Sequence, residues 1–243
     1  MPLPSADLTP DDEKPAAEVV AEGLAGEIGV PAPVRRTPAD SLAFVLSAVL
    51  SPYLVIPFGT LGIIYARSRS GDPFWLWAAI SIFFSTALPV IYVLIGMARG
   101  TISDVHVMER NQRGGPFAVA ILGGFLAAYV LHRLHAPPSV WGLSLLLSIN
   151  GLVIGIITTF TKISVHVSVL SSTVLCAVLL HTEINPYWLL WTIPALIWAR
   201  TKRGRHSAWQ GIGGALVATI VTGFALMMLG LGDRIGLFFE RAF

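Results

Sequence analysis

The sequence predicts an all-α integral membrane protein, a polytopic bundle of about seven transmembrane helices. Hydrophobic residues make up 54% of the chain and charged residues only 12%, whereas a soluble domain carries about 25% charged residues because its surface faces water. The mean hydropathy is +0.72. Apolar stretches of about 20 residues, the helical length that crosses a bilayer core, recur along the chain. These observations exclude a soluble globular fold for most of the protein.

The candidate spans are separated by short polar segments. They cover residues 41–66, 74–98, 116–131, 140–160, 164–180, 185–199 and 207–231. Pro52 and Pro57 predict kinks in the first span, and Pro137 and Pro138 end the third. Seven spans place the N-terminus and the 99–115, 161–163 and 200–206 segments on one face of the membrane.

The first 40 residues differ in composition from the rest. They are rich in Pro and Ala, and they hold eight acidic residues against three basic ones. Such a segment buries too little apolar surface to fold, so we expect residues 1–40 to be a disordered acidic tail. The transmembrane domain then covers residues 41–232, and residues 233–243 form a short amphipathic end.

Histidines and basic residues gather on the face that receives the N-terminus. They are His106, Arg110, Arg113, Lys162, His166, Arg200, Lys202, Arg203, Arg205 and His206. The 16 Lys and Arg residues divide 11 to 5 in favour of this face, which the positive-inside rule assigns to the cytoplasm. The division is 6 to 5 when the five cations that would serve a site are left out, namely Arg110, Arg113, Lys162, Arg200 and Arg203. The assignment of this face to the cytoplasm is therefore weak. Lys202, Arg203 and Arg205 suit interface anchors as well as site residues.

Two of the histidines lie where helices begin. His166 falls in the first turn of the fifth predicted span, and His206 immediately precedes the seventh. Helix N-termini favour phosphate because of their unpaired N–H groups and partial positive charge, and arginine adds forked donors. One histidine can then attack phosphorus while another protonates the departing alcohol.

Three segments resemble the motifs of the type 2 phosphatidic acid phosphatases, which are membrane lipid phosphatases. The third family motif reads Ser-Arg, five residues, His, three residues, Asp; the segment here is Ala199-Arg200, five residues, His206, three residues, Gln210. The second motif, Pro-Ser-Gly-His, matches Ile163-Ser164-Val165-His166. The first, Lys, six residues, Arg-Pro, matches His106, six residues, Arg113, then Gly114-Gly115-Pro116. The resemblance covers roughly residues 99–225.

The resemblance implies a lipid-phosphatase-like core and a role for each matching residue. His206 would be the nucleophile that forms a phosphohistidine, His166 the acid for the leaving group, and Gln210 the partner of His206. The phosphate-binding residues would be Arg113, Arg200, Lys162, Ser164, Arg110 and His106. No metal or other cofactor is implied. The implied substrate is a phosphate or diphosphate monoester of a lipid, of the polyprenyl or phosphatidic type.

The chain departs from the family pattern at His106, Val165 and Gln210, which replace Lys, Gly and Asp. In the family, the Asp accepts a hydrogen bond from the nucleophilic histidine and stabilises its positive form. The amide oxygen of Gln210 accepts the same hydrogen bond without a negative charge, and loss of that charge in the analogous serine-protease dyad costs about 10⁴ in rate. The chain therefore resembles a divergent member of the superfamily.

Other functions stay open at this point. One is a catalytically weak or inactive phospholipid-binding or transport protein of the same fold. Another is a membrane prenyltransferase, which would hold Mg²⁺ with Asp-rich motifs, but residues 99–115 offer only Asp104 and Glu109. A metal-dependent hydrolase that uses three histidines and Glu109 lacks the usual short helical ligand spacing. We expect a phosphorylated lipid as partner, no nucleic acid, and, from the Ala, Gly, Val and Arg usage, a bacterial inner membrane.

Overall fold

The computed structural model describes residues 37–103, 107, 112–180 and 186–231. The chain divides into two compact units, residues 1–39 and 40–243, and the fold described below is that of the second. The predicted acidic tail falls almost entirely, and the amphipathic C-terminal end entirely, outside the described residues. All secondary structure in the described part of the chain is helical.

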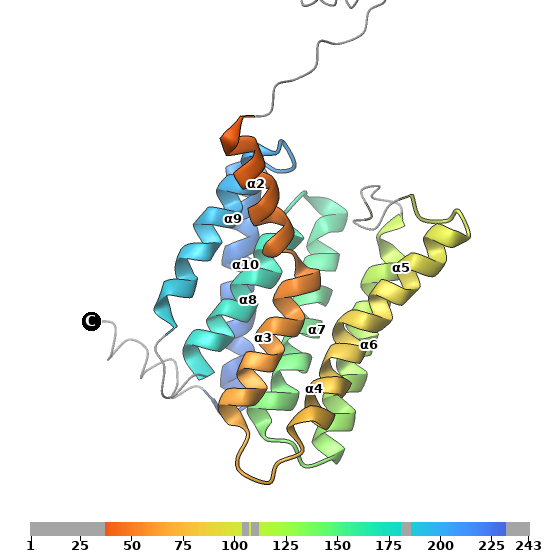
Figure 1. The fold of residues 1–243 in the computed structure, drawn as a ribbon, viewed down its shortest axis with the longest axis vertical. Helices are drawn as coiled ribbons and strands as arrows, with labels where there is room; N and C mark the ends of the chain where they lie inside the picture. Colours follow the sequence, from red (N-terminus) through yellow and green to blue (C-terminus); the bar gives the residue numbers. More distant parts are fainter. Residues whose placement is uncertain (1–36, 104–106, 108–111, 181–185, 232–243) are drawn as a thin grey trace, which may run out of the picture. The chain divides into compact units, whose positions relative to one another are not determined.

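Each predicted apolar segment corresponds to one, two or three helical elements (Figure 1). In chain order they are α2 (Pro38–Val49), α3 (Pro52–Arg67), α4 (Phe74–Ile82), the π-helix η2 (Phe83–Ala87), α5 (Leu88–Ala98), α6 (Gly114–Arg133), α7 (Pro138–Phe160), α8 (Val165–Leu180), the 3₁₀ helix η4 (Tyr187–Trp191), α9 (Thr192–Lys202) and α10 (Ala208–Met228).

Among the described residues, four helices are long and apolar enough to cross a membrane: the continuous helix Phe74–Ala98, α6, α7 and α10. The pair α2 and α3 passes the same test as a fifth span, bent by 53°. α8 is apolar but has 16 residues, which span about 24 Å of a core about 30 Å thick. The prediction of an integral membrane helical protein is supported, while the count of seven spans stays a prediction.

Prolines shape two of these spans. Pro52 lies at the start of α3, where a helix needs no N–H donor, and the bend between α2 and α3 occurs there, as predicted. Pro89 follows the π-helix η2, in the middle of the second span. Because proline removes a donor and crowds the preceding turn, a local widening of the helix accommodates it.

α8 is the most enclosed helix and contacts α3, α7, α9 and α10. Its interior face carries small hydroxyl side chains, one of which, Ser172, accepts a hydrogen bond from Thr222 of α10 (3.2 Å). Small residues let membrane helices approach closely, as Gly59 of α3 does against Thr173. The first turn of α8, which carries His166, is therefore surrounded by other helices.

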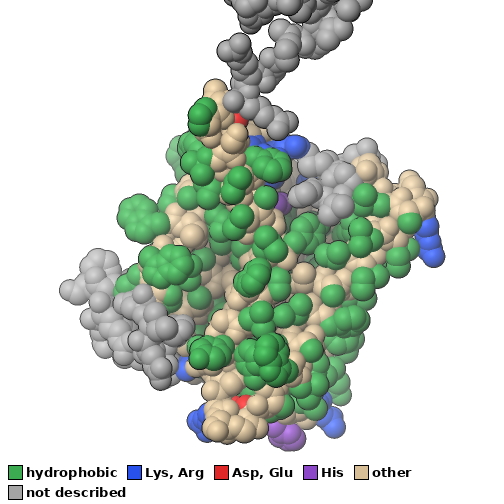
Figure 2. Space-filling model, in the orientation of Figure 1, with side chains coloured by type: hydrophobic (Ala, Val, Ile, Leu, Met, Phe, Trp, Pro, Cys, Tyr) green, Lys and Arg blue, Asp and Glu red, His purple; other side chains and the backbone are tan. Residues whose placement is uncertain are grey.

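The flank of the bundle is apolar (Figure 2). Large side chains such as Phe58 (68% exposed), Tyr65 (78%) and Phe224 (62%) lie on the surface. In Figure 2, Lys and Arg side chains lie near the ends of the bundle and hydrophobic ones cover its middle. A monomeric soluble protein does not expose apolar surface on this scale, whereas a lipid-facing helix does.

Candidate functional site

A single cavity of about 360 Å³ contains the central residues of all three sequence motifs. Arg113 at the start of α6, His166 on α8, Arg200 on α9 and His206 before α10 all line it. These residues are distant in sequence, and the packing of α6, α8, α9 and α10 brings them to the same space.

One end of the cavity is strongly cationic. We call this the cationic end; its residues are Arg113, His166, Arg200, Arg203, Arg205 and His206. No Asp or Glu among the described residues lines the cavity. The positive charges of Arg203, Arg205 and Arg113 act on Arg200. A cleft lined by charge of one sign attracts counter-ions, so this end suits a multiply charged anion.

The side chain of Arg200 carries an unsatisfied hydrogen-bond donor in the described part of the chain. Its Nε atom is buried and has no hydrogen-bond partner within the described part of the chain. A buried donor without a partner is costly, and native structures rarely keep one without a functional reason. An anionic oxygen in the cavity would satisfy it.

The amide oxygen of Gln210 fixes the tautomer of His206. The backbone N–H of Ser207 donates to Gln210 Oε1 (3.1 Å), so the atom at that position must be the oxygen. The same oxygen lies 3.2 Å from Nδ1 of His206. Nδ1 therefore carries the proton and donates it, which leaves the lone pair on Nε2. That is the arrangement a nucleophilic imidazole requires.

The surroundings of His206 keep its ring neutral. Burial, assisted by the positive charges of Arg200, Lys162 and Arg113, lowers the pKa of His206 to about 4, although its hydrogen bond with Gln210 acts in the opposite direction. At neutral pH the ring is uncharged, and its lone pair is available for attack on phosphorus.

The start of α10 is joined to the start of α8. Ser207 and Gln210 form a capping box at the N-terminus of α10, and the Gln210 carbonyl accepts the backbone N–H of Ser164 (3.1 Å). This bond fixes the segment that precedes His166 relative to the segment that carries His206. The predicted donors of Ser164 are thus placed behind the cavity wall, since the residue is fully buried and does not line the cavity.

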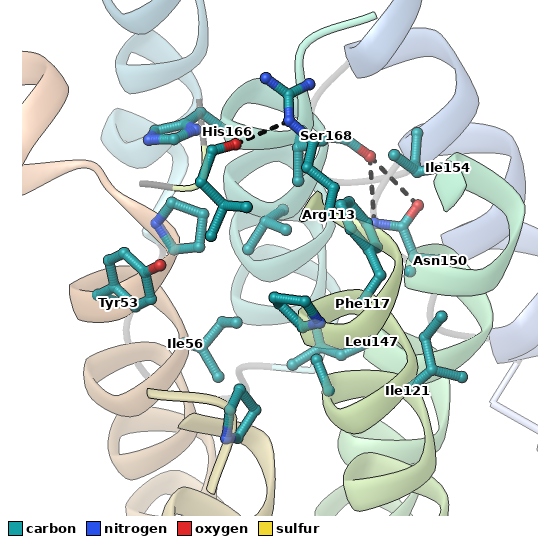
Figure 3. A pocket seen from close by; sticks show the side chains of 18 of the residues that line it. Tyr53, Ile56, Arg113, Phe117, Ile121, Leu147, Asn150, Ile154, His166 and Ser168 are labelled. Carbon is teal, nitrogen blue, oxygen red and sulfur yellow. Dashed lines mark hydrogen bonds between the residues drawn. The ribbon is translucent and has the colours of Figure 1, made fainter. Parts of the chain in front are cut away.

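The side chain of Arg113 is oriented by the loop before α6. Its Nε donates to the carbonyl oxygen of Val107 (2.9 Å; Figure 3). Val107 is buried and adopts φ = 45°, a conformation that β-branched residues rarely adopt. Strained backbone of this kind is common where a functional side chain must be held in place.

The remaining predicted residues fall into two groups. Lys162 is exposed and does not line the cavity, but its charge reaches His206. His106 and Arg110 lie outside the described residues. The sequence left Arg203 and Arg205 open, and the structure places both in the cavity lining. A turn at Gly204 (φ = 63°) returns the chain so that the Arg205 N–H bonds the Arg200 carbonyl (3.0 Å).

Lys202, the third residue left open, points elsewhere. Its Nζ lies 3.5 Å from a carboxylate oxygen of Asp40, and both side chains are partly exposed. Its neighbour Arg203 lies over the ring of Phe44, 5.0 Å from the centroid. Both contacts tie α2 to the end of α9, so α2 borders the cationic end.

The opposite end of the cavity is apolar. Figure 3 shows Arg113 and His166 at one end and Ile56, Leu147 and Ile121 at the other. A ligand that fits the whole cavity therefore has an anionic head and a hydrocarbon part, as a phosphorylated lipid does.

Within the described residues, no three His, Cys, Asp or Glu side chains gather closely enough to hold a metal ion.

No protein-family model, curated protein or solved structure matches this chain.

Proposed function

We propose that the protein is a membrane lipid phosphatase that hydrolyses a phosphate or diphosphate monoester of a lipid through a phosphohistidine intermediate. One observation carries the proposal: the cavity combines two histidines and four arginines at one end with an apolar lining at the other. The order of Arg113, His166, Arg200 and His206 along the chain, and their resemblance to the phosphatase motifs, give independent support.

In the first half of the reaction, the phosphate lies at the cationic end. The lone pair on Nε2 of His206 forms a bond to phosphorus as the bond from phosphorus to the lipid oxygen breaks. His166 gives its proton to that oxygen, and the lipid alcohol leaves. Arg113 and Arg200 neutralise the charge on the phosphoryl oxygens, which is the main contribution a protein makes to phosphoryl transfer.

In the second half, water replaces the lipid alcohol. His166, now neutral, takes a proton from the water as its oxygen bonds to phosphorus. The P–N bond breaks, the electron pair returns to Nε2 of His206, and inorganic phosphate leaves. His166 is then protonated again for the next cycle, so the protein returns to its starting state.

A second candidate function is lipid-phosphate binding or transport without chemistry. The observation in its favour is Gln210, which holds His206 in the right tautomer but supplies no negative charge for the positive ring that forms during transfer. Both candidates require the cationic end, and only the phosphatase requires the lone pair of His206.

Release of inorganic phosphate from a panel of lipid phosphates and diphosphates, in EDTA, separates these candidates. The phosphatase predicts release by the wild type and loss of about 10³-fold or more in His206→Gln. His132→Gln is the matched control, because His132 is exposed and does not line the cavity. Binding without release supports the binding protein. Release of inorganic phosphate only with added Mg²⁺ supports a metal-dependent hydrolase, and release of inorganic diphosphate only with added Mg²⁺ supports the prenyltransferase.

A further inference from the structure

A second set of polar side chains lines the same cavity inside the apolar part of the bundle. Asn150 on α7 and Ser168 on α8 are fully buried and exchange hydrogen bonds, Nδ2 to Oγ at 3.2 Å and Oγ to Oδ1 at 3.3 Å. Thr86 on η2 also lines the cavity, and its Oγ1 is buried with no partner among the described residues. We call Thr86, Asn150 and Ser168 the polar shelf.

Thr86 and Asn150 of the polar shelf lie at similar distances from the ends of their helices. Thr86 precedes the end of α5 at Ala98 by 12 residues, and Asn150 precedes the end of α7 at Phe160 by 10. At 1.5 Å per residue these separations are about 18 Å and 15 Å. In Figure 3 the pair of Asn150 and Ser168 lies between the guanidinium of Arg113 and the apolar end.

Two hydrogen-bond donors of the polar shelf are not used by other described residues. The amide of Asn150 carries two N–H groups, and its bond with Ser168 uses one of them. The hydroxyl of Thr86 adds another donor. Polar groups at membrane depth are costly unless they are satisfied, so a cavity that keeps two unused donors there is suited to a ligand with acceptors at that position.

We infer that the polar shelf binds an ester carbonyl of the lipid, and that the substrate is an acylglycerol phosphate rather than a polyprenyl phosphate. The inference rests on the proposed function for the position of the phosphate. An acylglycerol phosphate carries carbonyl oxygens a few bonds from its phosphate. Ser168 of the shelf follows His166 of the cationic end by two residues on α8, which is about 3 Å along the helix axis. A polyprenyl chain offers only C–H groups there and would leave both donors unsatisfied.

The test compares three lipid phosphates of similar chain length: a diacylglycerol phosphate, its diether analogue and a polyprenyl phosphate. Binding to His206→Gln is measured by displacement of a fluorescent diacylglycerol phosphate in detergent micelles, so that no turnover is needed. We expect the diester to bind about tenfold more tightly than the diether, because two hydrogen bonds to its carbonyls are lost in the ether. The polyprenyl phosphate should bind as weakly as the diether.

Thr86→Val then removes one donor while keeping the side-chain shape. It should reduce the diester advantage to about threefold and leave the affinity for the diether unchanged. Because the hydroxyl has no partner among the described residues, the variant should fold as the parent does. Ser81→Ala is the matched control: Ser81 lies on the same continuous helix, its hydroxyl is also buried without a partner in the described part of the chain, and it does not line the cavity.

Equal affinity for diester and diether, or an advantage that survives Thr86→Val, would overturn the inference. So would the absence of binding by any of the three lipids. The proposed function fails by a different result, which is lack of phosphate release by the wild type from every lipid. An ester preference that depends on Thr86 is measurable in either case.

Discussion

At the scale of single residues, the pairing of His206 with Gln210 determines which ring nitrogen of His206 carries the proton. It also leaves the ring with a neutral partner instead of a negatively charged one. Gln210 Oε1 accepts from the Ser207 N–H and lies 3.2 Å from His206 Nδ1, so a neutral amide occupies the place of a carboxylate. In the proposed reaction this geometry favours attack by Nε2, while the missing charge raises the free energy of the positively charged ring in the transition state.

Gln210→Glu tests this directly, since glutamate has the same shape and is also a favourable capping-box residue at this position. The new carboxylate should raise the pKa of His206 and increase the rate of phosphate release by about 10²-fold, within the range set by the serine-protease dyad. The measurement is kcat for phosphate release from the best lipid substrate. An unchanged or lower kcat with an intact fold would show that the charge at this position does not limit the reaction.

The pKa of His206 makes a second prediction at this scale. Burial and nearby cations lower it to about 4 from an ordinary value of 6.5. The folded state therefore resists protonation, and as the pH falls from 6.5 towards 4 the unfolded state takes up a proton that the folded state does not. Stability from this group is complete above pH 6.5 and is lost across that window.

NMR of histidine-labelled protein in phosphate-free buffer should show His206 titrating near pH 4, with His206→Gln providing the assignment. Added inorganic phosphate should raise the midpoint, because a bound anion offsets the charges of the arginines. Arg200→Gln should raise it as well, since Arg200 is the strongest of the cations that act on the ring. A midpoint at the ordinary value of 6.5 would contradict the described burial of the ring.

At the scale of elements, the site depends on how closely α10 approaches the start of α8. A Cβ added at Gly214 would lie 2.7 Å from the backbone oxygen of Ser164, whereas one at Gly213 would meet only a side-chain atom of Ile163 at 3.6 Å. Backbone cannot move aside as a side-chain end can. The glycine at 214 therefore allows the Ser164 N–H to reach the Gln210 carbonyl.

Gly214→Ala should lower the stability of the protein by about 1–3 kcal/mol, as overpacking does elsewhere. It should also reduce phosphate release, because His166 and His206 are moved apart. Gly213→Ala, one residue away, should have little effect on either quantity. Thermal unfolding and kcat are compared for the two variants; similar effects from both would show that the close approach at Gly214 is unimportant.

The helices also show which features of the fold could be predicted from the sequence and which could not. Apolar segments located the helices, and Pro52 located the bend, because transfer to lipid and loss of an N–H are local properties. The motif spacings predicted a shared site for His166, Arg200 and His206, and all three residues line one cavity. The roles assigned to these residues stay predictions.

Other features depend on contacts that no local pattern records. Arg203 and Arg205 could not be distinguished from interface anchors until the turn at Gly204 placed them in the cavity. The pairing of Asn150 with Ser168 and its position in the cavity depend on packing between α7 and α8. The π-helix that precedes Pro89 likewise gave no periodic signal in the sequence.

At the scale of the whole molecule, the predicted topology puts the cationic end on one side of the membrane. Figure 1 shows the α9–α10 connection at one end of the bundle and the α3–α4 and α6–α7 connections at the other. α8 has 16 residues, and η4 and α9 have 5 and 11. These segments are shorter than the roughly 20 residues that cross a bilayer core, so the count of seven spans needs an experimental test.

Single cysteines introduced into Cys176→Ala test whether α8 crosses the membrane, because Cys176 is the one cysteine in the chain. Ser70→Cys, Thr161→Cys and Thr182→Cys are labelled with a membrane-impermeant maleimide in intact cells and in inverted vesicles. Seven spans with the site in the cytoplasm predict labelling at 70 and 182 from outside and at 161 only from inside. Labelling at 182 together with 161 would mean that α8 does not cross the membrane.

The central claim is that His206 forms a covalent bond to phosphorus. The most direct measurement is to quench the protein during turnover of a ³²P-labelled lipid phosphate and to analyse the bound label. Label that resists alkali, is released by acid, maps to the peptide containing His206 and is absent from His206→Gln is the result we predict. Rapid phosphate release with no trapped label in the wild type, or label that persists in His206→Gln, would contradict the account.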